Sequence, residues 1–273
     1  MDNKIRICCP CHFGLESVLK YEINKIGGTD LHVTDGKITF SGDFNTIARA
    51  NICLSTAERV LIELGEFEAR TFEELFQGVK AIEFENYIGI NDAFPVKGHS
   101  LNSALHSVPD CQSIIKKAVV ERLKSKYNVN WFEESNSVVQ IQFSILKDKV
   151  NIYLDTSGIG LHKRGYRKNS NTAPIKETLA AGIIDLARVR SDSIVCDPFC
   201  GSGTILIEAA LKALKIAPGI NRRFAAEKWE CIDKEIWREE RSRAIDLVDR
   251  NAKFEGIGCD IDDFAVALTL DNA

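Results

Sequence analysis

Two spacings of hydrophobic residues alternate along the first 64 residues. Leu15, Val18, Leu19 and Ile23 recur every three to four positions, which predicts a helix that ends at Gly27-Gly28. We also expect strands over 5–9 and 59–64, a hairpin over 31–40 with its turn at Asp35-Gly36, and a second helix over 44–52. Residues 1–64 are therefore expected to form a small α+β module.

A second set of patterns predicts another mixed domain over residues 65–160. Thr71 and Glu74 have the spacing of a capping box at the start of a helix. Residues 94–97 look like a strand that enters a polar loop over 98–103, and a long helix is expected after Ser107. Alternating residues predict a half-buried strand over 138–146, and a turn at 147–149 leads to another strand over 150–155.

One face of this long helix is basic. Lys116, Lys117 and Lys124 lie on it, and Glu121 is the acidic residue among them. Lysines on one helix face can contact the phosphates of an RNA, so these three residues are candidate RNA-binding residues. The alternative is that they merely solvate the helix.

The strongest pattern for ligand binding lies in the last part of the chain, residues 161–273. A short β-branched strand over 194–196 runs into a glycine-rich turn over 197–204, and a helix-forming segment follows. Glycines let a backbone approach a ligand, and the helix start offers free N–H groups. A second strand-like segment ends in carboxylates at Asp260 and Asp262, where a nucleoside ribose would be held.

Two common glycine loops do not fit this turn. A nucleotide P-loop requires a lysine directly after its last glycine, and no lysine follows Gly203. A dinucleotide fingerprint requires a third glycine, and Leu206 stands at that position.

A basic segment precedes this last part of the chain. Lys163, Arg164 and Arg167 can neutralise phosphates, and Tyr166 can stack on a base, so these four are further RNA-binding candidates. The alternative is an ordinary basic linker. A helix is expected to follow, with Asn171 or Thr172 as its cap.

Charge, apolar runs and cysteine content limit the partners and the cellular compartment that we expect. The net charge of −4 gives no global argument for nucleic-acid binding, so such a role requires local basic patches. No apolar run is long enough to span a bilayer, and the odd number of cysteines, nine, favours free thiols in the cytoplasm. Cys8 and Cys11 have a zinc-ligand spacing, but no second pair accompanies them, so we expect buried thiols and no metal site.

The full string of the glycine turn carries a family resemblance. Asp-Pro-Phe-Cys-Gly-Ser-Gly-Thr at 197–204 resembles motif I of Rossmann-like, S-adenosylmethionine-dependent methyltransferases, and Asp260-Ile261-Asp262 resembles their acidic motif. With the 162–167 link and the 173–181 helix, the whole chain resembles the THUMP-containing RNA guanine-N2 methyltransferases of the bacterial RlmL type. This implies a ferredoxin-like module, then a THUMP domain, then a partial Rossmann-like methyltransferase domain.

The resemblance also implies a function and a set of cofactor-binding residues. We expect S-adenosylmethionine as the cofactor, 23S ribosomal RNA as the partner, and N2-methylation of a guanosine as the reaction. Asp197 would meet the amino group of the cofactor, Asp260 or, less favoured, Asp262 its ribose, and Ile261 its adenine. The implied cofactor-binding residues are Asp197, Phe199, Cys200, Gly201, Ser202, Gly203, Thr204, Asp260, Ile261 and Asp262.

The chain departs from the family in one respect. The family's motif with two consecutive prolines, which holds the target amine, has no counterpart in this sequence, so no catalytic residue is expected within it. We therefore expect the sequence to represent part of a longer enzyme. The alternatives are a DNA amino-methyltransferase and a noncatalytic RNA-binding protein that retains a relic cofactor fold.

Overall fold

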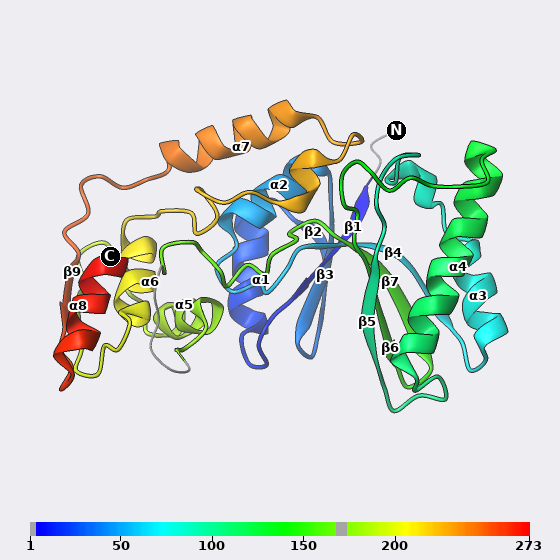
Figure 1. Cartoon of the computed structure of the whole chain (residues 1–273). Coiled ribbons are helices and arrows are strands. Elements are labelled where there is room, and N and C mark those ends of the chain that lie inside the picture. Colours follow the sequence, from blue (N-terminus) through cyan, green and yellow to red (C-terminus); the bar gives the residue numbers. More distant parts are fainter. Residues whose placement is uncertain (1–3, 168–173) are drawn as a thin grey trace. The chain divides into compact units, whose positions relative to one another are not determined.

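The computed structural model describes residues 4–167 and 174–273, and its parts form two compact units (Figure 1). The first unit contains residues 4–8, Leu61–Gly158 and Phe224–Lys234. The second contains Cys9–Val60, Ile159–Arg223 and Glu235–Ala273. Most of the predicted N-terminal module therefore packs in one unit with the segment that carries the glycine turn. The domain boundaries at 64/65 and 160/161 stay predictions.

The strands of the first unit lie in the order β1 (Ile5–Pro10), β4 (Leu61–Glu68), β7 (Lys149–Asp155), β6 (Ile141–Leu146) and β5 (Val96–Leu101). All neighbours are antiparallel except β5 and β6, which run parallel. The predicted alternation in β6 is confirmed, because Ile141, Phe143 and Ile145 are buried.

Helices α3 (Phe72–Lys80) and α4 (Val108–Tyr127) pack side by side on this sheet (Figure 1). The predicted capping box is present, since Glu74 N donates to Thr71 Oγ1 at 3.2 Å and Thr71 N donates to Glu74 at 3.1 Å. Two short 3-10 turns, η1 (Phe84–Asn86) and η2 (Ala225–Lys228), complete the unit. The indole of Trp229 is 1% exposed and donates to the carbonyl of Val138 at 3.1 Å.

The polar segment at 98–103 is not wholly a loop, contrary to the prediction. Gly98 to Leu101 belong to β5 and pair with Phe143 to Leu146 of β6. A Cβ at Gly98 would lie 2.2 Å from the carbonyl oxygen of Phe143, so only glycine allows the two backbones to come this close. The parallel partner is distant in sequence, and local polarity therefore gave no sign of the strand.

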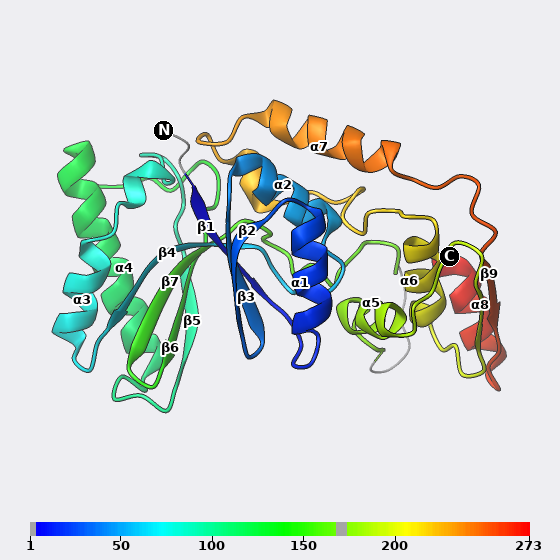
Figure 2. The ribbon, with the colours of Figure 1, turned by 180° about the vertical axis from the view of Figure 1, so that it is seen from behind.

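In the second unit, the N-terminal elements agree with the predicted pattern. They are α1 (Glu16–Lys25), the antiparallel pair β2 (Thr29–Thr34) and β3 (Lys37–Gly42), and α2 (Phe44–Cys53), seen from behind in Figure 2. Asp43 starts α2 by accepting a hydrogen bond from Thr46 N at 2.7 Å. Cys8 and Cys11 are both buried, and burial is the main cause that raises the pKa of Cys11 to about 12.

The remaining elements of the second unit come from the last part of the chain. They are α5 (Glu177–Leu186), β8 (Ile194–Asp197), α6 (Thr204–Ala213), α7 (Lys234–Asp246), β9 (Glu255–Gly258) and α8 (Asp263–Asn272). Strands β8 and β9 are parallel, with Asp197 paired to Gly258, and α6 packs on both. Asn171 and Thr172, the expected caps, lie outside the described residues; Lys176 precedes α5 without a capping side-chain bond. No helix in the described part of the chain is long and apolar enough to cross a membrane.

Candidate cofactor site

The glycine turn has a backbone that requires glycine. Gly201 and Gly203 have φ angles of 55° and 78°, in the left-handed region that residues with a Cβ rarely adopt. At Gly203 space also forbids a side chain, because a Cβ would lie 2.7 Å from Thr269 Cγ2. Gly203 directly precedes α6, so the turn ends where the helix presents its free N–H groups.

The turns after β8 and β9 are joined by three hydrogen bonds. Cys259 N donates to Asp197 O at 2.9 Å, and Cys200 N donates to Cys259 O at 2.8 Å. Gly201 N donates to the carboxylate of Asp260 at 2.9 Å. The two motifs, about 60 residues apart in sequence, therefore form one continuous surface at the carboxyl ends of two parallel strands, where ligands of such folds bind.

The two acidic residues after β9 have different roles. Asp262 precedes α8 and accepts a hydrogen bond from Phe264 N at 2.9 Å, so it caps this helix. Asp260 accepts from Asp262 N and Gly201 N, and these main-chain bonds lower its pKa. The carboxylate of Asp260 is thus held ionised at the junction of both turns, whereas Asp262 serves the helix.

Two residues that the sequence did not suggest support the turn. The hydroxyl of Thr269 donates to Gly201 O, and the side-chain amide of Asn272 donates to Ser202 O, each at 3.1 Å. Thr269 and Asn272 are three positions apart on α8 and so lie on one helix face. The spacing of these two polar residues on α8 was the available signal.

The side chains of the site divide into exposed and buried groups. Phe199 is 84% exposed and Ile261 is fully exposed, so both can contact a ligand. Cys200, Ser202 and Thr204 are buried, and the hydroxyls of Ser202 and Thr204 lie 3.2 Å apart. Asp197 is half-buried, and one of its oxygens accepts from Phe199 N at 3.1 Å. The buried three shape the turn, and a ligand can reach Asp197, Phe199, Asp260 and Ile261.

The link segment, defined as residues 161–167, is not a solvated linker. Arg164 is 5% exposed, and its guanidinium donates to the carbonyls of Leu161 and Ser55 and to the carboxylate of Glu208. Glu208 is itself 3% exposed and accepts a hydrogen bond from Tyr166 at 3.0 Å. A buried and paired guanidinium favours a structural role over the predicted phosphate contact.

Arg167 reaches the start of α6. Its guanidinium donates to Thr204 Oγ1 at 2.6 Å and to the carbonyl of Ile175, and it lies 3.5 Å from the carboxylate of Glu177. Thr204 and Glu208 are one helical turn apart, so the link segment holds α6 at two successive points of one face. In contrast, Lys163 is exposed.

The three candidate lysines of α4, in the first unit, also differ. Lys116 donates to Phe94 O at 3.1 Å, pairs with Glu134 at 2.6 Å and lies 3.5 Å from the centre of the Phe94 ring. Lys117 is exposed, with its ammonium 5.7 Å from the ring of Phe76, and Lys124 is half-buried. Lys117 and Lys124 are therefore the freer of the three. Among residues 4–167 and 174–273, no cluster of histidine, cysteine and acidic residues is placed to hold a metal ion.

Three protein-family profiles match successive parts of the chain. Residues 6–61 match the RlmL ferredoxin-like domain, residues 69–155 the THUMP domain, and residues 164–273 the RMKL-like methyltransferase domain. The Bacillus subtilis protein named "Putative RNA methyltransferase YpsC" is 44% identical over 274 residues, which cover 99% of this chain and 71% of that protein. The chain belongs to the RlmL-type family of THUMP-containing methyltransferases. The predicted family and fold class are thus confirmed.

Solved structures agree with this assignment. A Listeria monocytogenes protein described as a predicted N6-adenine-specific DNA methylase is 44% identical, with a TM-score of 0.95 over 99% of this chain and 71% of its own. SMU.472, described as "a putative methyltransferase complexed with SAH", is 39% identical, with a TM-score of 0.95 over 100% of this chain and 72% of its own. TrmN from Thermus thermophilus, at 17% identity and a TM-score of 0.65, shares the fold over 98% of this chain and 69% of its own.

Proposed function

We propose that this family member takes part in S-adenosylmethionine-dependent N2-methylation of a guanosine in large-subunit ribosomal RNA. The observation that carries the cofactor part is the junction of the glycine turn with Asp260, at the edge where two parallel strands end. The THUMP match over residues 69–155 supports RNA as the substrate. Nine free thiols suit the reducing cytoplasm as the setting.

S-adenosylmethionine is the cofactor of the methyltransferase domain. SMU.472, which is 39% identical, carries SAH, the product that remains after methyl transfer. The residues present fit this group. Gly201 and Gly203 let the main chain approach its methionine part, the ionised Asp260 suits its ribose, and the exposed apolar side chains suit its adenine. When bound, the cofactor supplies a methyl group on a sulfonium, which is already electrophilic, so the chemistry requires no metal.

The residues of the site divide this binding among themselves. Gly201 and Gly203 let the backbone approach the methionine part of the cofactor. Asp197 has a second carboxylate oxygen to accept from the cofactor's ammonium. Asp260 accepts from the ribose hydroxyls, since Asp262 is committed to the cap of α8, and Ile261 lies against the adenine.

RNA contacts are best assigned to the basic residues that the fold leaves accessible. Lys117 and Lys124 on α4 and Lys163 in the link segment carry this role. Lys116, Arg164 and Arg167 are held by protein partners, and Tyr166 donates to Glu208. The target guanosine is flipped out of its stack, because an N2 amine inside a helix is inaccessible to a bound cofactor.

A methyl-transfer assay tests the proposal. The full gene product is incubated with labelled cofactor and undermodified ribosomal RNA, and the modified nucleoside is identified by its mass. We expect N2-methylguanosine. Methylation of another RNA nucleoside would contradict the base assignment and leave the RNA methyltransferase assignment standing.

The DNA alternative is favoured by the description of the Listeria monocytogenes structure as a predicted N6-adenine-specific DNA methylase. Methylation of duplex DNA and not of ribosomal RNA in the same assay would decide for it. Calorimetric titration with S-adenosylmethionine addresses the relic alternative, which predicts RNA binding without detectable cofactor binding.

A further inference from the structure

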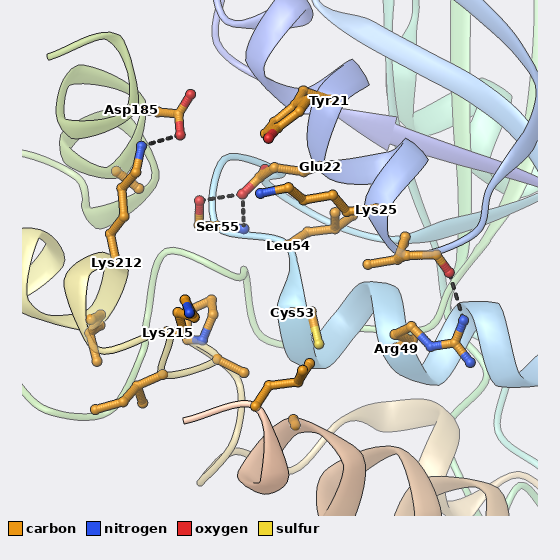
Figure 3. A pocket seen from close by; sticks show the side chains of 18 of the residues that line it. Tyr21, Glu22, Lys25, Arg49, Cys53, Leu54, Ser55, Asp185, Lys212 and Lys215 are labelled. Carbon is orange, nitrogen blue, oxygen red and sulfur yellow. Dashed lines mark hydrogen bonds and ion pairs between the residues drawn. The ribbon is translucent and has the colours of Figure 1, made fainter. Parts of the chain in front are cut away.

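A cavity of about 340 Å³ lies within the second unit (Figure 3). The glycine turn, residues 197–204, contributes no residue to its lining. Its walls come from α1, the end of α2, α5, the C-terminal half of α6 with the residues that follow, and α7. Its volume is in the range of small-molecule sites in proteins. The apolar part of the wall contains Ile26, Leu54, Leu211, Ile216 and Leu247. Cys53 also lies in the wall, and burial is the main cause that raises its pKa to about 11, so its thiol is neutral.

The carboxylates in the wall are all engaged by the protein. Glu22 accepts from the main chain and hydroxyls of Ser55 and Thr56, as Figure 3 shows for Ser55. Asp185 pairs with Lys212, Glu208 with Arg164, and Glu240 with Arg49 at 2.6 Å. A bound cation would find no free carboxylate here.

The cations in the wall outnumber these carboxylates by one, and two of them have no acid of their own. Lys215 pairs with Asp249 at 3.4 Å. Within residues 4–167 and 174–273, neither Lys25 nor Arg243 has a carboxylate within 4.0 Å; the ammonium of Lys25 lies 4.2 Å from the centre of the Tyr21 ring. Both residues are exposed, so they line the cavity at its solvent side. Lys25 precedes Ile26, whose carbonyl accepts from Arg49, and Arg243 is three positions after Glu240, the partner of Arg49.

We propose that this cavity is a second ligand site, for a small organic anion whose apolar or aromatic body enters the cavity while a phosphate or carboxylate meets Lys25 and Arg243. The carboxylates in the wall are already engaged by protein partners, and these partners offset the repulsion that a bound anion would meet. The ligand contacts α1 and α2 together with α6, the helix that begins at the glycine turn. The site is independent of the proposed function, since it contains none of the residues assigned to the cofactor.

Calorimetric titration of the full chain tests the site with two anions of different origin. The probes are uridine monophosphate and octanoate, with uridine and octanol as uncharged counterparts. Saturating S-adenosylmethionine is present throughout, so that the glycine turn is not the site measured. We expect at least one anion to bind with a Kd below about 1 mM and at least tenfold tighter than its counterpart; the anion that binds identifies the source.

Single-residue variants locate the binding. Lys25→Gln and Arg243→Gln each remove one charge-assisted contact and are expected to weaken the anion about tenfold or more. Lys20→Gln, on the same helix but outside the cavity, is the matched control and leaves affinity unchanged. Ala244→Leu fills the cavity and abolishes binding; if that variant does not fold, Cys53→Leu makes the same test.

Two results would overturn the inference. One is that neither anion binds with a Kd below about 1 mM. If Lys25→Gln and Arg243→Gln then weaken only the binding of a ribosomal RNA fragment, these cations belong to an RNA surface. The other is binding that the glutamine variants affect no more than Lys20→Gln does.

Discussion

The main-chain N–H of Gly201 donates to the carboxylate of Asp260 at 2.9 Å, which joins the turn after one strand to the turn after its neighbour. This bond fixes the left-handed glycine while a second oxygen of Asp260 accepts from Asp262 N. Asp260 therefore positions the loop and faces the proposed ribose site at once. Replacing Asp260 should therefore weaken cofactor binding by loosening the loop and by removing the ribose contact.

Asp260→Asn is expected to weaken S-adenosylmethionine binding about tenfold or more, because a neutral amide accepts hydrogen bonds less strongly than a carboxylate. Calorimetric titration measures the change. Asp263→Asn, at an exposed position in the first turn of α8, is the control and should bind like the parent protein. Equal affinities in the two variants would argue against Asp260 as the ribose-binding residue.

Gly203→Ala is expected to destabilise the second unit and to reduce cofactor affinity. The left-handed φ costs a residue with a Cβ roughly 1–2 kcal/mol, and the new methyl group would also press on Thr269. Gly14→Ala is a matched control, because Gly14 has a φ of 87° but open space around it. Thermal unfolding should place Gly203→Ala below Gly14→Ala, and cofactor affinity should fall only in the former.

Arg164→Ala is expected to lower the free energy of unfolding by about 3–5 kcal/mol, since it leaves the carboxylate of Glu208 buried without its ion-pair partner. Lys163→Ala, at the exposed neighbouring position, should change stability by less than about 0.5 kcal/mol. Urea unfolding monitored by tryptophan fluorescence measures both. Similar small losses in the two variants would mean that the buried pair contributes little.

RNA binding should distinguish the accessible lysines from the lysine that the protein itself holds. Lys163→Ala and Lys124→Ala are each expected to reduce the slope of log affinity against log salt by about one, because each removes a phosphate contact. Lys116→Ala should leave this slope unchanged, since Lys116 is held by Glu134 and Phe94 O. Filter binding to a ribosomal RNA fragment at several salt concentrations makes the comparison.

The ion pair of Glu85 with Arg122 predicts a dependence of stability on pH in the first unit. Burial acts to raise the pKa of Glu85, but hydrogen bonds from Arg122 outweigh it and lower the pKa from its ordinary 4.5 to about 2. A lowered folded-state pKa means that the stabilisation is fully present above pH 4.5 and is lost as pH falls towards 2. The stability difference between the parent protein and Glu85→Gln should therefore shrink over this range and stay constant from pH 5 to 7.

Local patterns were sufficient wherever one segment determines its own structure. The capping box at Thr71, the Asp35-Gly36 turn and the glycine turn before α6 all follow from residues within a few positions of each other. The cap of α8 is equally local, because Asp262 accepts its hydrogen bond from Phe264 N, two positions further along the chain.

What the sequence could not provide depends on partners far along the chain. A basic linker remained an alternative for the link segment, because Glu208, the acid that pairs with Arg164, is 44 positions away. Likewise, Gly98 to Leu101 looked like a loop until their parallel partner strand was known. The cavity is lined by five segments that are distant from one another in sequence, so no single stretch of the chain predicts it.

The hydrogen bonds from the link segment to α6 have a practical consequence for protein engineering. Arg167 and Arg164 are spaced to meet Thr204 and Glu208 one helical turn apart, so the segment has a fixed length and not merely a basic composition. Inserting even one residue between 164 and 167 would break this match. Expression fragments of the methyltransferase half should therefore begin before Leu161, and flexible insertions or affinity tags belong elsewhere in the chain.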